Sequence, residues 1–191
     1  MTITASPAVP ALSAPRSQQL SASKMIDSAL LHDARRRAGQ AEAALAAGDP
    51  LAARAAAREA VAVVRDVLGG RSPELASVLS VQAQAERLLG DVDEALACAS
   101  EASAIMTAVA GGGALDRVRV RARRELAEVL SDQGEHAAAR ACFAAALRDA
   151  ERTLGRTDLT TAAVLQELAG VDDDAPRSHA RSFAIVGATA R

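Results

Sequence analysis

The chain has 191 residues, 50% of them apolar, and a formal net charge of −2, so it is long enough to fold around a hydrophobic core. This charge does not favour binding to nucleic acid or to an acidic membrane surface, and no charge-free apolar run is long enough to cross a membrane. Aromatic residues make up only 1% and alternating strand patterns are almost absent, so an all-α fold with an Ala, Val and Leu core is predicted.

Composition divides the chain into three parts. Residues 1–23 contain three prolines, which forbid a continuous helix, and are predicted to be a disordered arm with no secretion signal. Residues 24–171 carry helical patterns throughout. Residues 172–191 begin with an acidic step and a proline, and are predicted to be a flexible tail. For the apolar run 183–186 in this tail, docking on the helices, pairing with a partner and disorder are all open.

Glycine-containing turns separate the predicted helices. Gly48-Asp49-Pro50 ends one helix and begins the next, and Ser72-Pro73 supplies an N-cap and a first helical residue. A seventh helix over 158–170 has no following partner, so it is predicted to cap the array. The six helices before it are predicted at residues 23–47 (or from 27), 50–68, 73–89, from the Gly90-Asp91 turn to 110, 115–133 and 135–154.

A repeated frame underlies these helices. Gly48, Gly90 and Gly134 are 42 and 44 residues apart, and an acidic residue follows each of them. Alanine stands seven residues before each glycine, and small residues follow it at five, nine and twelve residues, except that Phe143 takes the ninth position in the third repeat. A fixed period of this length is typical of stacked helical repeats.

The frame resembles the tetratricopeptide repeat, on the evidence of Leu126-Ala127, Gly134, Ala139, Phe143 and Ala146. Its longer period, with Leu-Gly ending a second helix at Leu68-Gly69 and Leu154-Gly155, is similar to the 42-residue repeats of kinesin light chains. The resemblance implies a right-handed α-α superhelix of three helix pairs with a capping helix. It departs from the family at its aromatic anchors, which are replaced by Arg37, Ala44, Leu79, Glu86, Arg123 and Leu130.

The chain has no recognisable catalytic or cofactor-binding motif. His32, His136 and His179 are far apart in sequence, and neither they nor the two cysteines have the spacing of metal ligands. No phosphate-binding loop or dinucleotide fingerprint is present. We therefore expect no enzyme activity, no cofactor and no metal, in a cytoplasmic protein.

Two further clusters have plain structural interpretations. Cys98 and Cys142 occupy equivalent positions in successive repeats, too far apart for a disulfide, so both thiols are predicted to be free. The densest charged run is predicted to form a solvated helix face whose arginines pair with nearby glutamates, rather than a nucleic-acid site. Its members are Arg117, Arg119, Arg121, Arg123 and Arg124.

By resemblance, the first helices of the repeats line a concave groove that holds an extended or helical peptide. The predicted groove residues are Arg35, Ser77, Ser80, Gln84, Arg87, Arg121, Arg124 and Glu128. Their arginines favour an acidic or carboxylate-bearing peptide, because a guanidinium can bind a carboxylate through two parallel hydrogen bonds. Glu42, Glu128 and Asp132 lie on the same side and could instead neutralise these arginines.

The function predicted from the sequence is a non-catalytic protein-interaction scaffold or adaptor. Two alternatives are open: a regulatory module that acts in trans in a bacterial transcription or signalling system, and a structural protein that assembles with copies of itself. Neither nucleic acid nor membrane is an expected partner, and a homo-oligomer is compatible with all three functions.

Overall fold

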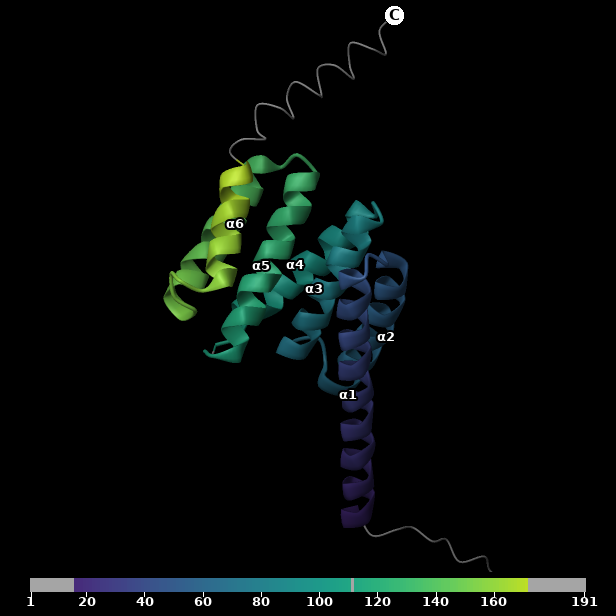
Figure 1. Cartoon of the computed structure of the whole chain (residues 1–191). Helices are drawn as coiled ribbons and strands as arrows, with labels where there is room; N and C mark the ends of the chain where they lie inside the picture. Colours follow the sequence, from purple (N-terminus) through teal and green to yellow (C-terminus); the bar gives the residue numbers. More distant parts are fainter. Residues whose placement is uncertain (1–15, 111, 172–191) are drawn as a thin grey trace, which may run out of the picture.

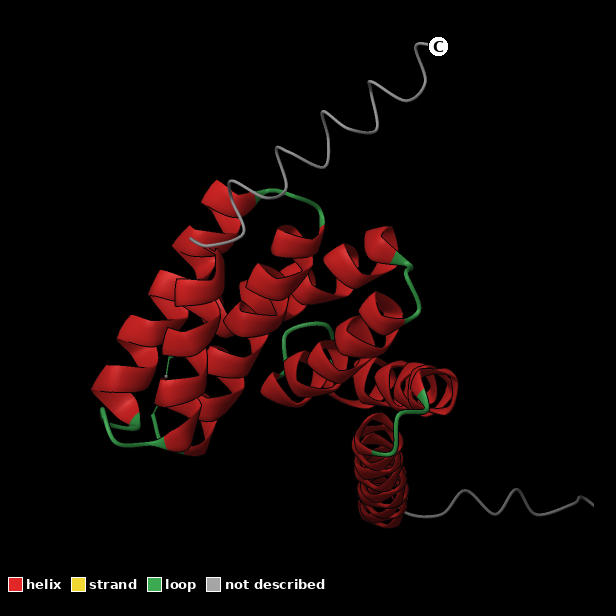
Figure 2. Ribbon diagram, turned by 45° about the horizontal axis from the view of Figure 1, so that its top comes forward, coloured by secondary structure: helices red, strands yellow, loops and turns green. Residues whose placement is uncertain are grey.

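Seven helices form three antiparallel pairs and one further helix, and no strand occurs in the described residues, 16–110 and 112–171 (Figures 1 and 2). In this computed structural model the pairs are α1 (Arg16–Ala46) with α2 (Pro50–Leu68), α3 (Pro73–Leu88) with α4 (Val92–Ala108), and α5 (Ala114–Asp132) with α6 (His136–Thr153). Residues 159–171 form the terminal helix. The predicted all-α superhelix of three helix pairs with a capping helix is thus confirmed.

Side chains are described from residue 24 onward, so the predicted tail and the first 15 residues of the predicted arm lie outside the described part of the chain. The predicted arm is wrong for residues 16–23, because α1 already begins at Arg16. The three prolines of this region all precede Arg16, and the next proline is Pro50, so no helix breaker stands within α1. The first half of α1 projects beyond the other helices (Figure 1).

The other helix ends lie within two residues of their predicted positions, because glycines in the left-handed conformation and capping side chains fix where these helices end and begin. Gly48, Gly90 and Gly134 have φ angles of 77°, 80° and 82°, where a side chain would be strained. The Asp49 carboxylate accepts a 3.0 Å hydrogen bond from the Ala52 amide and so caps α2. Ser72 caps α3 in the same way. None of the described helices is both long and apolar enough to span a bilayer.

Small residues fill the space between the helices at the positions of the repeated frame. The alanines at these positions are all fully buried: Ala41, Ala53, Ala57, Ala60, Ala83, Ala95, Ala99, Ala102, Ala127, Ala139 and Ala146. Phe143 is only 2% exposed and packs in one cluster with Val120, Ala127 and Val164. Val164 belongs to the terminal helix, so this cluster joins that helix to the third pair.

Ion pairs between helices stand at the positions where the family has aromatic anchors. They join Arg37 to Glu59, Arg123 to Asp149, and Glu86 to Arg58. Glu86 is fully buried, with carboxylate oxygens 2.8 Å from Arg58 and 3.7 Å from Arg54. Charged contacts between α1 and α2, between α2 and α3, and between α5 and α6 therefore take the place of aromatic packing.

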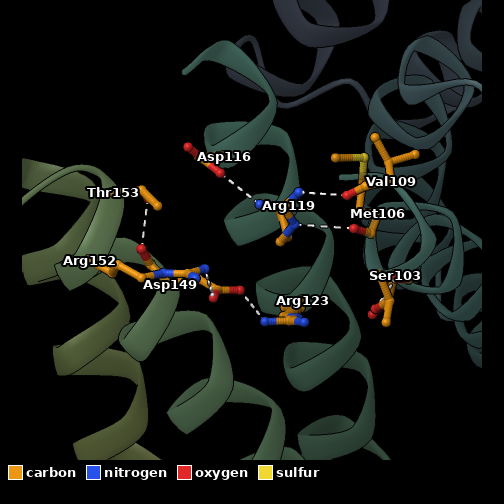
Figure 3. A network of polar contacts seen from close by, with 10 residues as sticks. Ser103, Met106, Val109, Asp116, Arg119, Arg123, Asp149, Arg152 and Thr153 are labelled. Carbon is orange, nitrogen blue, oxygen red and sulfur yellow. Dashed lines mark hydrogen bonds and ion pairs between the residues drawn. The ribbon is translucent and has the colours of Figure 1, made fainter. Parts of the chain in front are cut away.

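The arginines of the α5 run are all paired with carboxylates, but only Arg124 pairs with the nearby glutamates of α5 as predicted, and the run is not a uniformly solvated face. Arg119 is buried, and its guanidinium donates to the Asp116 carboxylate at 2.6 Å (Figure 3). It also donates to the backbone carbonyls of Met106 and Val109, at 3.1 and 2.9 Å. These carbonyls end α4 and have no helical donor, so Arg119 ties the start of α5 to the end of α4.

Both cysteines are free, as predicted. Burial raises the pKa of the Cys98 thiol to about 12, whereas Cys142 is only partly buried, and its pKa is raised from the same cause. In the native protein at pH 8, iodoacetamide is therefore expected to alkylate Cys142 before Cys98, because the thiolate is the reactive form. Mass spectrometry after timed quenching measures both rates, and denatured protein serves as the control in which the two rates converge. Faster alkylation of Cys98 in the native protein would contradict its burial in α4.

Candidate functional site

Three cavities lie along the first helices of the repeats. The apolar cavity, of about 380 Å³, is lined by Leu31, Ala34, Arg35, Ala38, Gly39, Glu42, Val64, Pro73, Glu74, Ser77, Val78, Ala114, Leu115 and Val118. The middle cavity, of about 350 Å³, is lined by Glu42, Leu45, Ala46, Gln84 and Arg121. The distal cavity, of about 370 Å³, is lined by Arg87, Glu128, Ser131, Asp132, Phe143, Glu167, Gly170 and Val171. Together they follow α1, α3, α5 and the terminal helix.

Six of the eight predicted groove residues line these cavities: Arg35 and Ser77 the apolar one, Gln84 and Arg121 the middle one, and Arg87 and Glu128 the distal one. Ser80 does not. It is fully buried and its hydroxyl donates to the Ala76 carbonyl at 2.9 Å, so it is unavailable to a ligand. Arg124 lines none of the three cavities, and it lies beside carboxylates at 3.2 Å (Glu128) and 3.7 Å (Glu167).

Neighbouring carboxylates already pair with most of the groove arginines, and of the two arrangements left open by the sequence this is neutralisation by Glu42, Glu128 and Asp132 rather than free donors. Arg121 lies 2.6 Å from Glu42, which belongs to α1. Arg87 lies 2.5 Å from Glu128 and 3.2 Å from Asp132, both on α5. The physical reason is that the groove positions of α1 and α3 face those of α5, so an acid on one helix reaches an arginine on another.

Arg35 differs from the other groove arginines. Its nearest carboxylate, Glu74, is 4.0 Å away, and 70% of its side chain is exposed. It stands at the rim of the apolar cavity. Among the predicted groove arginines, Arg35 is the best placed to bind a carboxylate of a ligand.

The cavity linings as a whole carry more acidic than basic groups. Three arginines and five carboxylates line the three cavities: Arg35, Arg87 and Arg121 against Glu42, Glu74, Glu128, Asp132 and Glu167. Arg124 lies beside Glu128 and Glu167 and adds a fourth positive charge, so the groove keeps an excess of one negative charge. This excess favours a ligand with basic residues, opposite to the acidic peptide expected from the arginines alone.

A fully buried acid lies beneath the groove, between α3 and α5. Glu125 has no hydrogen-bond partner for either oxygen within the described residues, and its closest cation is Arg124, at 3.6 Å. Burial raises the pKa of Glu125 to about 7, and the charge of Glu128 adds to this, while Arg124, Arg121 and Arg87 oppose it. From the sequence, Glu125 is one of the nearby glutamates expected to pair with the arginine run on a solvated helix face. Its spacing could have indicated burial, because Glu125 lies three residues after Ala122 and four before Val129, on the same helix face as these two fully buried residues.

Replacing Glu125 with glutamine is expected to stabilise the protein at neutral pH. In the unfolded chain this carboxyl ionises near its ordinary pKa of 4.5, but in the folded chain it stays protonated up to about pH 7. Its contribution to stability therefore falls as the pH rises from 4.5 to 7, and stays low above pH 7. At pH 8, Glu125→Gln should raise the free energy of unfolding by on the order of 1–3 kcal/mol, with little change at pH 4.5.

Urea unfolding of both proteins at several pH values measures this difference. The comparison with the parent protein is essential, because Asp33 and Asp158 have lowered pKa values and give the opposite pH dependence in both proteins. Glu135→Gln is the matched control, since Glu135 is exposed and its side chain makes no capping hydrogen bond to α6. A stability difference that does not change with pH would show that Glu125 is ionised in the folded chain.

The residues that make the apolar cavity largely escaped the sequence analysis. Gly39, Val64, Leu115 and Val118 are outside the predicted groove positions, and α5 contributes only its first turns. The sequence feature that could have indicated them is the pair Leu115 and Val118, which lie three residues apart on one face of the first turn of α5. Within residues 24–110 and 112–171, no three His, Cys, Asp or Glu side chains are grouped so that they could hold a metal ion.

Comparisons with known proteins agree with this geometry. Two family models, each described as tetratricopeptide repeat, match residues 31–108 and 119–158, which together exceed half of the chain. Among solved structures, the crystal structure of BtubC (BKLC) from P. vanneervenii is similar, with a TM-score of 0.57 and 20% identity, over 90% of this chain and 74% of that chain. At this identity the likeness shows a shared fold alone. No curated protein gives a significant match. The two family models and the helix-pair geometry show that the chain belongs to the tetratricopeptide repeat family.

Proposed function

We propose that the protein is a non-catalytic interaction scaffold or adaptor that binds a segment of a partner protein along α1, α3 and α5. Repeats of this family typically mediate protein–protein interaction. The observation that carries the proposal is the apolar cavity of about 380 Å³, which is open to the groove and has charged residues only at its rim. A mostly apolar concavity with a few polar groups is the usual form of a binding site.

The cavity and the groove suggest the chemistry of the ligand. A large apolar side chain, such as leucine or phenylalanine, fits the apolar cavity between Leu31, Val78 and Val118. Basic residues beside it match the excess carboxylates of the groove. One carboxylate of the ligand can bind Arg35 at the rim. Of the acidic peptide predicted from the sequence, only one carboxylate, bound by Arg35, remains in this proposal.

Gly39 provides a sharp test. It lines the apolar cavity from the middle of α1, and a Cβ atom added there meets no atom within 4 Å. Gly39→Leu therefore has room for its Cβ atom and places an apolar side chain in the cavity, and Gly39→Ala is the matched control, because it raises helix propensity but leaves the cavity open. Loss of one buried apolar side chain costs about 1.5–3 kcal/mol, so Gly39→Leu should weaken a groove ligand by at least about tenfold.

The ligand class is found by selecting random peptides on the immobilised chain and measuring affinities by fluorescence anisotropy. Selected peptides should share a large apolar residue with lysine or arginine near it, and should bind the Gly39→Ala protein much more tightly than the Gly39→Leu protein. Equal affinity for both variants would place the binding surface elsewhere. A selection in which no peptide is enriched would remove the groove as a peptide site.

A further inference from the structure

We propose that residues 177–186 of the chain itself occupy the groove, with Phe183 in the apolar cavity, and so compete with a partner segment. This inference rests on the groove proposed above as a binding site. It assigns an occupant to a cavity that the described residues leave open between α1, α3 and α5.

The composition of this segment matches the ligand chemistry of the groove. Residues 175–191 contain three arginines and no acidic residue, and the apolar run 183–186 begins two residues after Arg181. Phe183 is one of only two phenylalanines in the chain, and the other, Phe143, is buried in the core. An apolar anchor beside basic residues is the pattern that the cavity linings favour.

The groove offers a partner for each part of this pattern. Leu31, Val78 and Leu115 line the apolar cavity, where an aromatic ring would leave water. Glu42 and Glu74 stand at its rim. Glu42 already pairs with Arg121, whereas the one cation paired with Glu74 in the described part of the chain is Arg35, at 4.0 Å. Arginines placed next to Phe183 can therefore reach carboxylates when the ring is in the cavity.

The chain is long enough to make this contact. The terminal helix runs alongside α5 in the same direction, because Arg117 pairs with Asp158 at 3.2 Å and Arg124 with Glu167 at 3.7 Å. Val171 therefore lies level with the end of α5, and the apolar cavity lies at its start. The distance is about 24 Å along α5 and two helix spacings of about 8–10 Å across. Twelve residues from Val171 to Phe183 reach up to about 40 Å, which exceeds the resulting separation of roughly 30 Å.

Attachment to the same chain makes even a weak contact sufficient. A short flexible connection gives an effective concentration on the order of 1 mM. A segment that binds with a Kd of about 100 μM would then fill the groove in about 90% of molecules. A partner would bind about tenfold more weakly than to an empty groove.

Fluorescence of Phe183→Trp in the full chain tests the inference directly, because the natural chain has no tryptophan or tyrosine. The indole is expected to be protected from acrylamide quenching. Adding Gly39→Leu should raise the exposed fraction of the indole about fivefold, if the contact weakens tenfold from a 90% filled groove. Adding Gly39→Ala instead should leave it protected, and circular dichroism should show equal helix content in all three proteins.

Each other outcome has a definite meaning. An indole that is freely quenched in all three proteins overturns the inference. Protection that Gly39→Leu does not change also overturns it, because the segment then binds elsewhere. Protection that grows with protein concentration overturns the intramolecular contact and assigns the segment to the groove of a second copy.

A second measurement separates this inference from the proposed function. Phe183→Ala in the full chain should raise the affinity for a peptide selected on the groove by about tenfold. If the peptide binds the natural chain and the Phe183→Ala chain equally, with Gly39→Leu still blocking it, the groove is a binding site and the self-contact is wrong. In the opposite case, Gly39→Leu changes the affinity of no selected peptide but still exposes the indole to acrylamide. The proposal of an external peptide ligand is then wrong, and the contact of the chain with its own groove stands.

Discussion

Replacing Phe143 with alanine is expected to lower the free energy of unfolding by about 3–5 kcal/mol, which is the usual cost of removing a buried phenylalanine. The ring is 2% exposed and packs against Val120 and Ala127 of α5 and Val164 of the terminal helix. In a core built mostly of alanine, the neighbouring side chains are too short to close the space that the ring would leave. The cost should therefore be at the upper part of this range.

Urea unfolding followed by circular dichroism measures the effect. Leu159→Ala is the matched control on the terminal helix, because Leu159 is 87% exposed and its loss should change stability by less than about 0.5 kcal/mol. A decrease below about 1 kcal/mol for Phe143→Ala would mean that the terminal helix does not close the third pair.

Replacing Arg119 with methionine is expected to cost about 3–5 kcal/mol, although the two side chains have similar size. The substitution leaves the Asp116 carboxylate without its cation in a site where that side chain is only 7% exposed. It also removes the donor from the carbonyls of Met106 and Val109 at the end of α4. A charge left buried and unpaired is far more costly than an exposed one.

The double variant Asp116→Asn/Arg119→Met separates these two contributions. It removes both charges, so it should recover part of the lost stability, while the carbonyls still lack a donor. Arg35→Met is the control for the side-chain change itself, since Arg35 is largely exposed and should change stability little. An Arg119→Met protein as stable as the parent would show that water can replace the guanidinium at this junction.

The helix pairs could be predicted because their signals are local. Glycine turns with acidic or serine caps fix where helices end, and small residues at constant offsets from each glycine fix which faces pack. The start of α1 could not be placed in this way. Composition suggested an arm, but helix formation from Arg16 depends on the absence of a breaker before Pro50 rather than on a start signal.

The groove positions were predictable and the groove chemistry was not. The family register places Arg87, Arg121 and Glu128 on the lining, where the structure has them. Whether an arginine is free depends on the acid opposite it on another helix, such as Glu42 beside Arg121, at a separation of 79 residues in the chain. Sequence offsets within one helix do not contain this information.

The arrangement of contacts has a consequence for how the chain folds. Each helix from α1 to α6 packs mainly against the next one in sequence, and the more distant contacts are fewer, chiefly between α1 and α3 and between α3 and α5. Such a topology has low contact order, for which rapid folding is expected, because little loop entropy is lost before packing is gained. During synthesis the first pair can form while later pairs are still being translated. Phe143 packs against Val164 of the terminal helix, so its burial is expected to be completed only after that helix has been synthesised.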